Sequence, residues 1–281
     1  RDVNGLTAHL DLLPTFIDLC GLRFEDKERF DGISLAPYLR GANTPVPERT
    51  LVVHNQGRFG EPVGAGLLIK DKDYSVMRGE WRLVGKELYD LADDASQRHD
   101  VAAKHPELAR RLRAAYEAWW KDISARADEF CPFVINPAKQ RTVLVSSQNL
   151  LGGEVAYSQR HVRKGEGGEG WTMIDVETPG RYRISLRRWP RESGLAIRDK
   201  APDYPMHPST HFMSKIPCKV LEVVRARLQV GAFDQTQDVQ PTAAEVVFDA
   251  KLEAGEQRIQ TWFTLADGTE QAAYYTYIEP W

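Results

Sequence analysis

The sequence predicts an α+β protein, in which a small antiparallel sheet with one long helix is followed by an all-β sandwich. Short β-like runs separated by turns occur within residues 50–90, and residues 105–128 carry a clear amphipathic helix pattern. Beyond residue 140, short and mostly alternating runs continue without a helix pattern. A length of 281 residues also favours two domains, because single cores rarely grow past about 250–300 residues.

The bulk composition excludes several classes of protein. With 42% hydrophobic and 27% charged residues, the chain reads as an ordinary globular protein. A formal net charge of −3 gives no argument for nucleic acid or an anionic membrane as partner, and no apolar run approaches the roughly 18 residues of a membrane span. Three widely separated cysteines, Cys20, Cys131 and Cys218, predict neither a disulfide framework nor a zinc ribbon. No signal-peptide pattern is present, so the compartment stays open.

The first element expected is a helix within residues 9–22, HLDLLPTFIDLCGL. Asp11 is placed to cap its start, and Gly21 supplies a left-handed stop. One short helical turn, with Ser34 as its cap, is expected in FDGISLAPYLRG. The apolar side chains of the first helix form one wide face that we expect to lie against a partner surface: Leu12, Leu13, Phe16, Ile17 and Leu19.

The small sheet is expected to begin with the strand TLVVHNQ at residues 50–56 and to continue through YSVMRG, WRLVG and ELYDL. The long helix that covers it has its apolar residues on one stripe: Leu108, Leu112, Ala115, Tyr116, Trp119 and Ile123. Two prolines in residues 129–140, EFCPFVINPAKQ, indicate a linker. We therefore expect a first part at residues 1–128 and a second at residues 141–281.

Residues 141–281 are expected to form a β-sandwich of jelly-roll-like type. Their short runs are bounded by Gly, Pro, Asp and Asn, as in antiparallel sheets. The clearest hairpin is VETPGRYRISL, whose inward-facing residues are predicted to be Val176, Tyr182, Ile184 and Leu186.

The best candidate for a ligand site in the first part is HNQGR, residues 54–58. It ends a predicted strand and opens an irregular, Gly-rich loop, where a rigid element often holds ligand-contacting side chains. His54, Asn55, Gln56 and Arg58 supply hydrogen-bond donors suited to hydroxyl groups or a sulfate-like anion. The alternative is an ordinary strand end whose polar side chains contact only water.

Other patterns have structural explanations. HPSTH at residues 207–211, with Cys218 downstream, offers metal ligands, but the neighbouring prolines favour a proline-pinned loop. KGEGGEG at residues 164–170 is acidic and opens no helix, so a mobile surface loop is expected rather than a phosphate cradle. Trp171, Trp189 and Tyr157 are candidates for a sugar-stacking platform. The favoured alternative is packing, with Trp189 at an edge or an interdomain seam.

Four segments follow one another in a specific order: AHLDLLPTFIDLCGL, FDGISLAPYLRG, RTLVVHNQ and WRLVGKELYDLADDASQRHDVAAKHPELARRLRAAYEAWW. Across residues 6–125 this order resembles the C-terminal portion of type I sulfatases of the arylsulfatase family. Residues 141–281, with WTMIDVETPGRYRISLRRWPRE and AAYYTYIEP, look like the β-sandwich extension of some bacterial members. The resemblance implies a parent enzyme with an alkaline-phosphatase-like α/β domain.

In such enzymes a cysteine or serine within Cys/Ser-x-Pro/Ala-x-Arg becomes formylglycine, whose hydrated form attacks sulfur, while calcium steadies the sulfate. Cys20, Cys131 and Cys218 all lack an arginine four residues on, so the resemblance assigns no catalytic or metal residue here. It places the formylglycine and the calcium ligands in a missing N-terminal catalytic domain of the same polypeptide, and the fragment is expected to be inactive alone.

The resemblance also places His54, Asn55 and Gln56 on the substrate side of the cleft, facing a sulfated small molecule or glycan. Family habit implies a secreted or periplasmic protein. Two alternatives remain: a carbohydrate-binding module in which Trp171 and Trp189 hold a sulfated glycan, or a phosphoesterase relative of the same superfamily.

Overall fold

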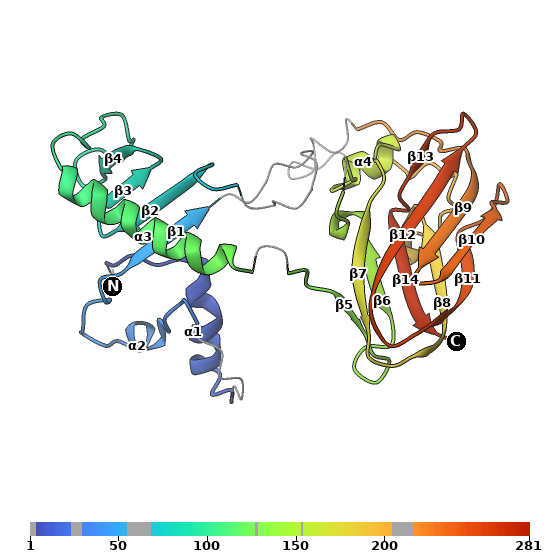
Figure 1. The fold of residues 1–281 in the computed structure, drawn as a ribbon, viewed down its shortest axis with the longest axis horizontal. Helices are drawn as coiled ribbons and strands as arrows, with labels where there is room; N and C mark the ends of the chain where they lie inside the picture. Colours follow the sequence, from blue (N-terminus) through green and yellow to red (C-terminus); the bar gives the residue numbers. More distant parts are fainter. Residues whose placement is uncertain (1–3, 24–29, 55–68, 127–128, 153, 204–215) are drawn as a thin grey trace. The chain divides into compact units, whose positions relative to one another are not determined.

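The computed structural model describes residues 4–23, 30–54, 69–126, 129–152, 154–203 and 216–281. These residues belong to two compact units, one ending near residue 127 and the other continuing to Trp281 (Figure 1). Each unit has a hydrophobic core of its own. Antiparallel sheets with few helices confirm the predicted α+β class.

The first unit begins with a short 3₁₀ turn, η1 (His9–Asp11), which leads into α1 (Leu12–Leu19); α2 (Ala36–Leu39) follows. Gly21 ends α1 as predicted, with a φ of 61° and with the Leu22 N–H donating to the carbonyl of Ile17 at 2.9 Å. Much of the predicted apolar face is exposed: 50% for Leu12, 55% for Leu13 and 54% for Phe16. Nothing in the described part of the chain covers this face.

Asp11 does not cap α1 with its side chain, contrary to the prediction. Its carboxylate turns back and accepts the Ala8 N–H at 2.8 Å, which caps η1, and it also accepts the Ile33 N–H at 3.0 Å. Arg49 completes the arrangement, with Nη1 donating to Asp11 Oδ1 at 2.7 Å. Ser34 accepts the Ala36 N–H at 3.2 Å, at the start of the predicted short helix. The side chain of Asp11 therefore connects three segments instead of one helix end.

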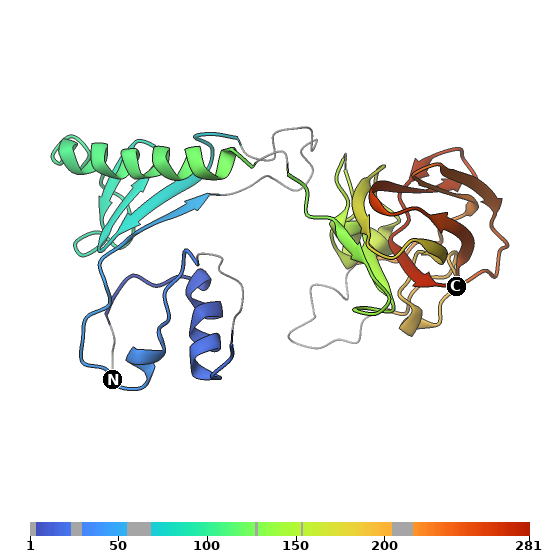
Figure 2. The ribbon, with the colours of Figure 1, turned by 60° about the horizontal axis from the view of Figure 1, so that its bottom comes forward.

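Four strands pair antiparallel in chain order, as the short runs predicted. They are β1 (Thr50–His54), β2 (Tyr74–Arg78), β3 (Trp81–Val84) and β4 (Glu87–Asp90). The long helix α3 (Pro106–Ser124) starts at a proline, whose missing N–H costs nothing in the first turn, and lies along one face of the sheet (Figure 2). Its predicted stripe is confirmed, because Leu112 and Tyr116 are buried in a cluster with Tyr74 and Val76.

The second unit contains two sheets. The first has the order β10-β9-β12-β7-β5, with β13 paired to β12, and the second has the order β11-β8-β14-β6. Their strands are β5 (Phe133–Ile135), β6 (Val143–Ser146), β7 (Trp171–Val176), β8 (Gly180–Arg187), β9 (Val223–Val230), β10 (Phe233–Asp238), β11 (Val246–Leu252), β12 (Gly255–Leu265), β13 (Glu270–Gln271) and β14 (Tyr275–Pro280). All neighbours are antiparallel except β5 and β7.

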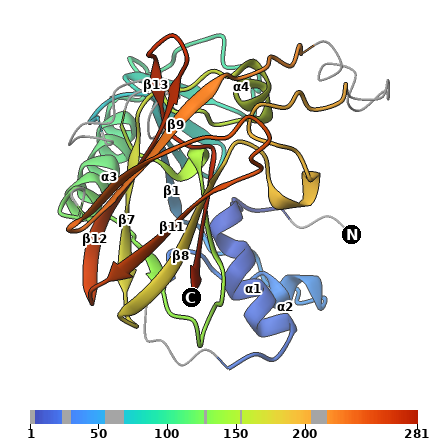
Figure 3. The ribbon, with the colours of Figure 1, turned by 90° about the vertical axis from the view of Figure 1, so that its right-hand side faces the viewer.

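The core of the second unit lies between these two sheets, which Figure 3 shows from another side. The predicted inward face of the hairpin is confirmed, since Val176, Tyr182, Ile184 and Leu186 are all buried. Ile174 of the first sheet and Phe248 of the second belong to the same buried cluster. Two sheets that share one core form a sandwich.

Two features of this unit differ from the prediction. β5 lies inside residues 129–140, the range expected to be a linker, because Pro132 and Pro137 flank this three-residue strand instead of interrupting it. The unit also contains helical turns where none was predicted: η2 (Ser147–Asn149), α4 (Gln159–Lys164) and η3 (Arg191–Ser193). Each is too short to show a helical period in the sequence.

Candidate functional site

His54 is the last residue of β1, and its ring lies against the aromatic residues of α3. The ring centroids are 5.6 Å from both Trp119 and Trp120 and 6.2 Å from Tyr116. Nε2 lies 3.2 Å from the carbonyl of Ile69, whereas Nδ1 is buried and has no hydrogen-bond partner among the described residues. A buried nitrogen without a partner is costly, which makes Nδ1 a candidate for contact with a group outside the described part.

The other residues of the HNQGR motif cannot be placed beside His54. Asn55, Gln56 and Arg58 lie outside the described residues. The predicted grouping of His54, Asn55 and Gln56 therefore stays a prediction.

Arg113 organises a charged network on α3, and its guanidinium lies 5.1 Å from the centroid of the Tyr116 ring. Its guanidinium donates to the Tyr74 hydroxyl at 2.6 Å, to Glu117 at 2.9 Å and lies 2.6 Å from the Asp71 carboxylate. The Tyr74 hydroxyl in turn donates to the carbonyl of Gly85 at 2.7 Å. Burial lowers the pKa of Arg113, but these hydrogen bonds outweigh it and raise the pKa. The arginine is therefore a fixed cation.

A cavity of about 440 Å³ opens beside this network, lined by Asp71, Tyr74, Leu83, Gly85, Lys86, Ala109, Arg110 and Arg113. One wall of the cavity includes Asp71, a non-glycine residue with a left-handed φ of 66°. The Asp71 N–H donates to the Tyr116 hydroxyl at 2.9 Å, which holds this turn on α3. The lining combines three cations and one carboxylate with an aromatic wall, but Arg110 pairs with Glu107 at 2.6 Å and Arg113 pairs with Asp71 and Glu117, so two of the three positive charges are already compensated.

The two tryptophans expected to stack on a sugar differ in their surroundings. Trp189 is only 3% exposed, and its Nε1–H donates to the carbonyl of Asp199 at 3.1 Å. Since its ring is enclosed, it offers no face to a sugar, and the packing alternative holds for it. Trp171 is half-buried; the Phe130 ring lies 5.3 Å away and the Arg258 guanidinium lies 4.6 Å from its centroid.

The described parts of the remaining motifs, Cys218 and the KGEGGEG loop, have structural partners within the chain. HPSTH lies outside the described residues, and the Sγ atom of Cys218 accepts the Ala201 N–H at 3.2 Å. In the part of the chain that the structure describes, no three His, Cys, Asp or Glu residues come close enough to hold a metal ion, so these residues do not fit calcium. The KGEGGEG loop was expected to be mobile, but backbone bonds hold it, including Gly168 N–H to Glu154 at 2.5 Å and Ala272 N–H to Gly168 at 3.1 Å.

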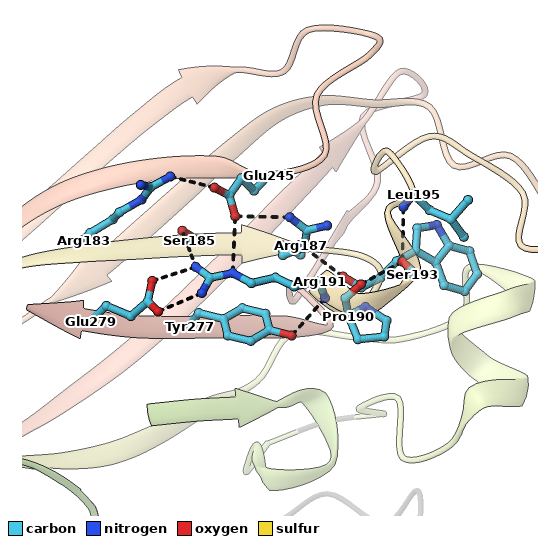
Figure 4. Close-up of polar contacts among 11 residues, drawn as sticks. Arg183, Ser185, Arg187, Pro190, Arg191, Ser193, Leu195, Glu245, Tyr277 and Glu279 are labelled. Carbon is cyan, nitrogen blue, oxygen red and sulfur yellow. Dashed lines mark hydrogen bonds and ion pairs between the residues drawn. The ribbon is translucent and has the colours of Figure 1, made fainter. Parts of the chain in front are cut away.

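The sequence analysis missed a charged network on the second sheet, drawn in Figure 4. Arg191 forms two bonds of 2.8 Å with Glu279, while Arg183 and Arg187 reach Glu245 at 2.8 and 3.2 Å. Alternating arginines in RYRISLR were the available signal, since every second residue of a strand shares a face. Because each of these three guanidinium groups has a carboxylate partner, the network ties strands together instead of presenting free charge.

Comparison with known proteins gives one informative match. No protein-family model matches the chain. An ulvan-active sulfatase from Formosa agariphila is 27% identical over 148 residues, which are 42% of this chain and 29% of that sulfatase. The chain thus spans less than a third of its relative's length. The match indicates that part of this chain is related to a sulfatase.

Among solved structures, a ruminal GH26 endo-β-1,4-mannanase is 12% identical and covers 55% of this chain and 27% of the mannanase, with a TM-score of 0.29. A TM-score of this size establishes no common fold. None of the helices in the described ranges combines the length and apolar character that crossing a membrane requires.

Proposed function

We propose that this chain is the C-terminal part of a sulfatase, an enzyme that hydrolyses sulfate esters. The observation that carries the proposal is the match to the ulvan-active sulfatase. The ordered segments that resemble sulfatases support it, because their described residues, within 4–54 and 69–126, fall in one compact unit. Ulvan is accordingly the first substrate to test, followed by other carbohydrate sulfates and aryl sulfates.

In this proposal the chemistry lies in another part of the same polypeptide. A formylglycine nucleophile and a calcium ion there would perform the hydrolysis, as the family resemblance implies. The exposed apolar face of α1 (Leu12, Leu13 and Phe16) would pack against that catalytic part, since burying such a face is favourable. The chain alone is then inactive.

His54 and the two residues after it would form one side of the substrate cleft. The proposal is supported by the position of His54 at the end of a strand, where the rings of Trp119 and Trp120 hold its imidazole. Asn55 and Gln56 would add amide donors and acceptors for sugar hydroxyls or the sulfate group.

The test is His54→Ala in the full-length enzyme. We expect kcat/KM on ulvan to fall about tenfold or more, because one positioned hydrogen-bonding group contributes on that order. His99→Ala is the matched control, since the His99 side chain is 80% exposed, and it should leave both constants unchanged. If His54→Ala changes neither kcat nor KM, the substrate-side assignment fails.

A second assay tests the location of the chemistry. The 281-residue chain is incubated with an aryl sulfate and calcium, and no turnover is expected. Turnover by this chain would overturn the proposal that the catalytic residues lie in another part of the polypeptide. With the full-length enzyme, faster hydrolysis of the matching phosphate ester would favour the phosphoesterase alternative.

A further inference from the structure

The outer face of the first sandwich sheet carries a group of polar side chains that the proposed function does not use. In the strand register, Gln260 of β12 lies between Trp171 of β7 and Gln229 of β9. Arg258 is two residues before Gln260, so it shares this face. Ile259, the residue between them, is buried in the core. Two glutamines, one arginine and one tryptophan therefore meet on one solvent-facing surface.

A cavity of about 270 Å³ lies on this surface, lined by Gln229, Gly231, Arg258 and Gln260. We name it the Arg258 cavity. Gly231 contributes no side chain, and its left-handed φ of 53° turns the chain from β9 into β10. The volume is near the lower end of small-ligand sites, which hold about 300–1,000 Å³. It suits a single sugar unit of a longer chain.

Arg258 is held in place without being neutralised. Its Nη2 donates to Gln260 Oε1 at 2.8 Å, and its guanidinium lies 4.6 Å from the centroid of the Trp171 ring. No carboxylate pairs with it among the described residues, whereas Arg227 on the same sheet pairs with Asp234. A fixed guanidinium that keeps its charge suits a planar or tetrahedral anion.

Gln229, which is half-buried, adds a second polar group that can contact a ligand. Its amide forms no hydrogen bond within the described ranges, although it lines the cavity. An amide offers both donors and an acceptor, which matches the hydroxyl groups of a sugar. The pairing of free amide and fixed cation favours an anionic sugar over a simple anion, because a simple anion would use only the arginine.

We propose that the Arg258 cavity binds an anionic sugar unit of an oligosaccharide, with Arg258 on the carboxylate or sulfate group and Gln229 on the hydroxyl groups. Trp171 and Gln260 act as positioning residues, since they orient Arg258. This role differs from sugar stacking by Trp171, because the guanidinium already lies over its ring. The proposal goes beyond sulfate hydrolysis, since binding here needs no nucleophile.

The test measures binding of the whole chain by isothermal titration calorimetry to three tetrasaccharides: a sulfated galactan, a polygalacturonate and a neutral galactan. We expect the anionic probes to bind at least tenfold tighter than the neutral one, and the tighter of the two identifies the preferred anion. Arg258→Gln should weaken anionic binding about tenfold and Gln229→Ala about threefold. Arg183→Gln, an exposed arginine on the other sheet, is the matched control and should change affinity less than twofold.

Three results would overturn the proposal: no binding of either anionic probe, equal affinity for the neutral probe, or equal weakening by Arg258→Gln and Arg183→Gln. The positioning role has a separate readout. Trp171→Ala should weaken anionic binding in the wild-type background but have no further effect in Arg258→Gln, and Trp171→Phe should retain most of the affinity. Additive losses would remove Trp171 from this role. Because the assay measures binding alone, its outcome is independent of whether the full-length enzyme is a sulfatase.

Discussion

Arg49 Nη1 donates to Asp11 Oδ1 at 2.7 Å and so joins two segments that are 38 residues apart. The Asp11 side chain is fully buried, and the Arg49 side chain is only 13% exposed. Because Asp11 also accepts the Ala8 and Ile33 N–H groups, this pair fixes the path of the chain around α1.

Removing the Asp11 carboxylate should loosen the segments around Ala8 and Ile33. We expect Asp11→Ala to destabilise it by about 3 kcal/mol, since breaking a buried pair leaves an uncompensated charge on Arg49. Amide hydrogen exchange at Ala8 and Ile33 should rise strongly. Asp18→Ala is the control, because its pair with Arg40 is exposed to solvent, and it should leave exchange at both amides nearly unchanged. Unchanged exchange in Asp11→Ala would show that the pair does not hold the segments.

The same carboxylate predicts acid sensitivity. Burial raises the pKa of Asp11, but hydrogen bonds from Arg49, Ala8 and Ile33 and the charge of Arg49 outweigh it and lower the pKa to about 2. The unfolded chain has the ordinary value of 3.8, so the folded state binds this proton less readily. The stabilisation is therefore fully present above about pH 4 and is lost as the pH falls towards about 2.

The measurement is hydrogen exchange at the Ile33 amide between pH 5 and pH 2, corrected for the intrinsic rate. Protection should decrease over that window in the wild type and show little pH dependence in Asp11→Asn, which cannot titrate. A wild-type profile as flat as that of Asp11→Asn would contradict the assignment.

Arg188 is fully buried in the sandwich and has no carboxylate partner among the described residues. It donates instead to the backbone carbonyls of Val162, Arg163, Asp199 and Lys219. Two of these belong to the last turn of α4, where the helix end is negative. The Val162 and Arg163 carbonyls also accept the backbone N–H groups of Gly165 and Lys219. Burial lowers the pKa of Arg188, and the carbonyl oxygens offset part of the cost of burying its charge.

We expect Arg188→Met to destabilise the sandwich by about 2 kcal/mol, because the hydrogen bonds from the buried guanidinium to four backbone carbonyls are lost. Urea unfolding followed by tryptophan fluorescence measures the change in the midpoint. Arg181→Met, at an arginine that is 62% exposed, should shift the midpoint much less. Wild-type stability in Arg188→Met would mean that the desolvation cost of the cation equals the benefit of its hydrogen bonds.

The apolar face of α1 gives a prediction about solubility. Leu13→Ser combined with Phe16→Ser should change the free energy of unfolding by less than about 0.5 kcal/mol, because both side chains are more than half exposed. Binding of the dye ANS to the chain should fall, since the dye reports exposed apolar surface. A large loss of stability would show that this face is already packed.

Much of the fold was predictable because the controlling signals are local. The long helix α3, the four short strands of the first sheet and the inward face of the β7–β8 hairpin follow from the period of apolar residues. β5 and α4 were missed, since three and six residues are too few to establish a period.

The sequence by itself determined the α+β class and the helices and strands whose apolar residues recur at regular spacing. It also showed that no formylglycine motif surrounds its three cysteines. Only the tertiary structure decided that Trp189 is enclosed, that Asp11 turns to Arg49 and that Arg258 lies near Gln229 with no carboxylate partner among the described residues. The physical reason is that the spacing of apolar residues along the sequence shows which face of a helix or strand is apolar. Hydrogen bonds and ion pairs, in contrast, join residues that lie far apart in the chain.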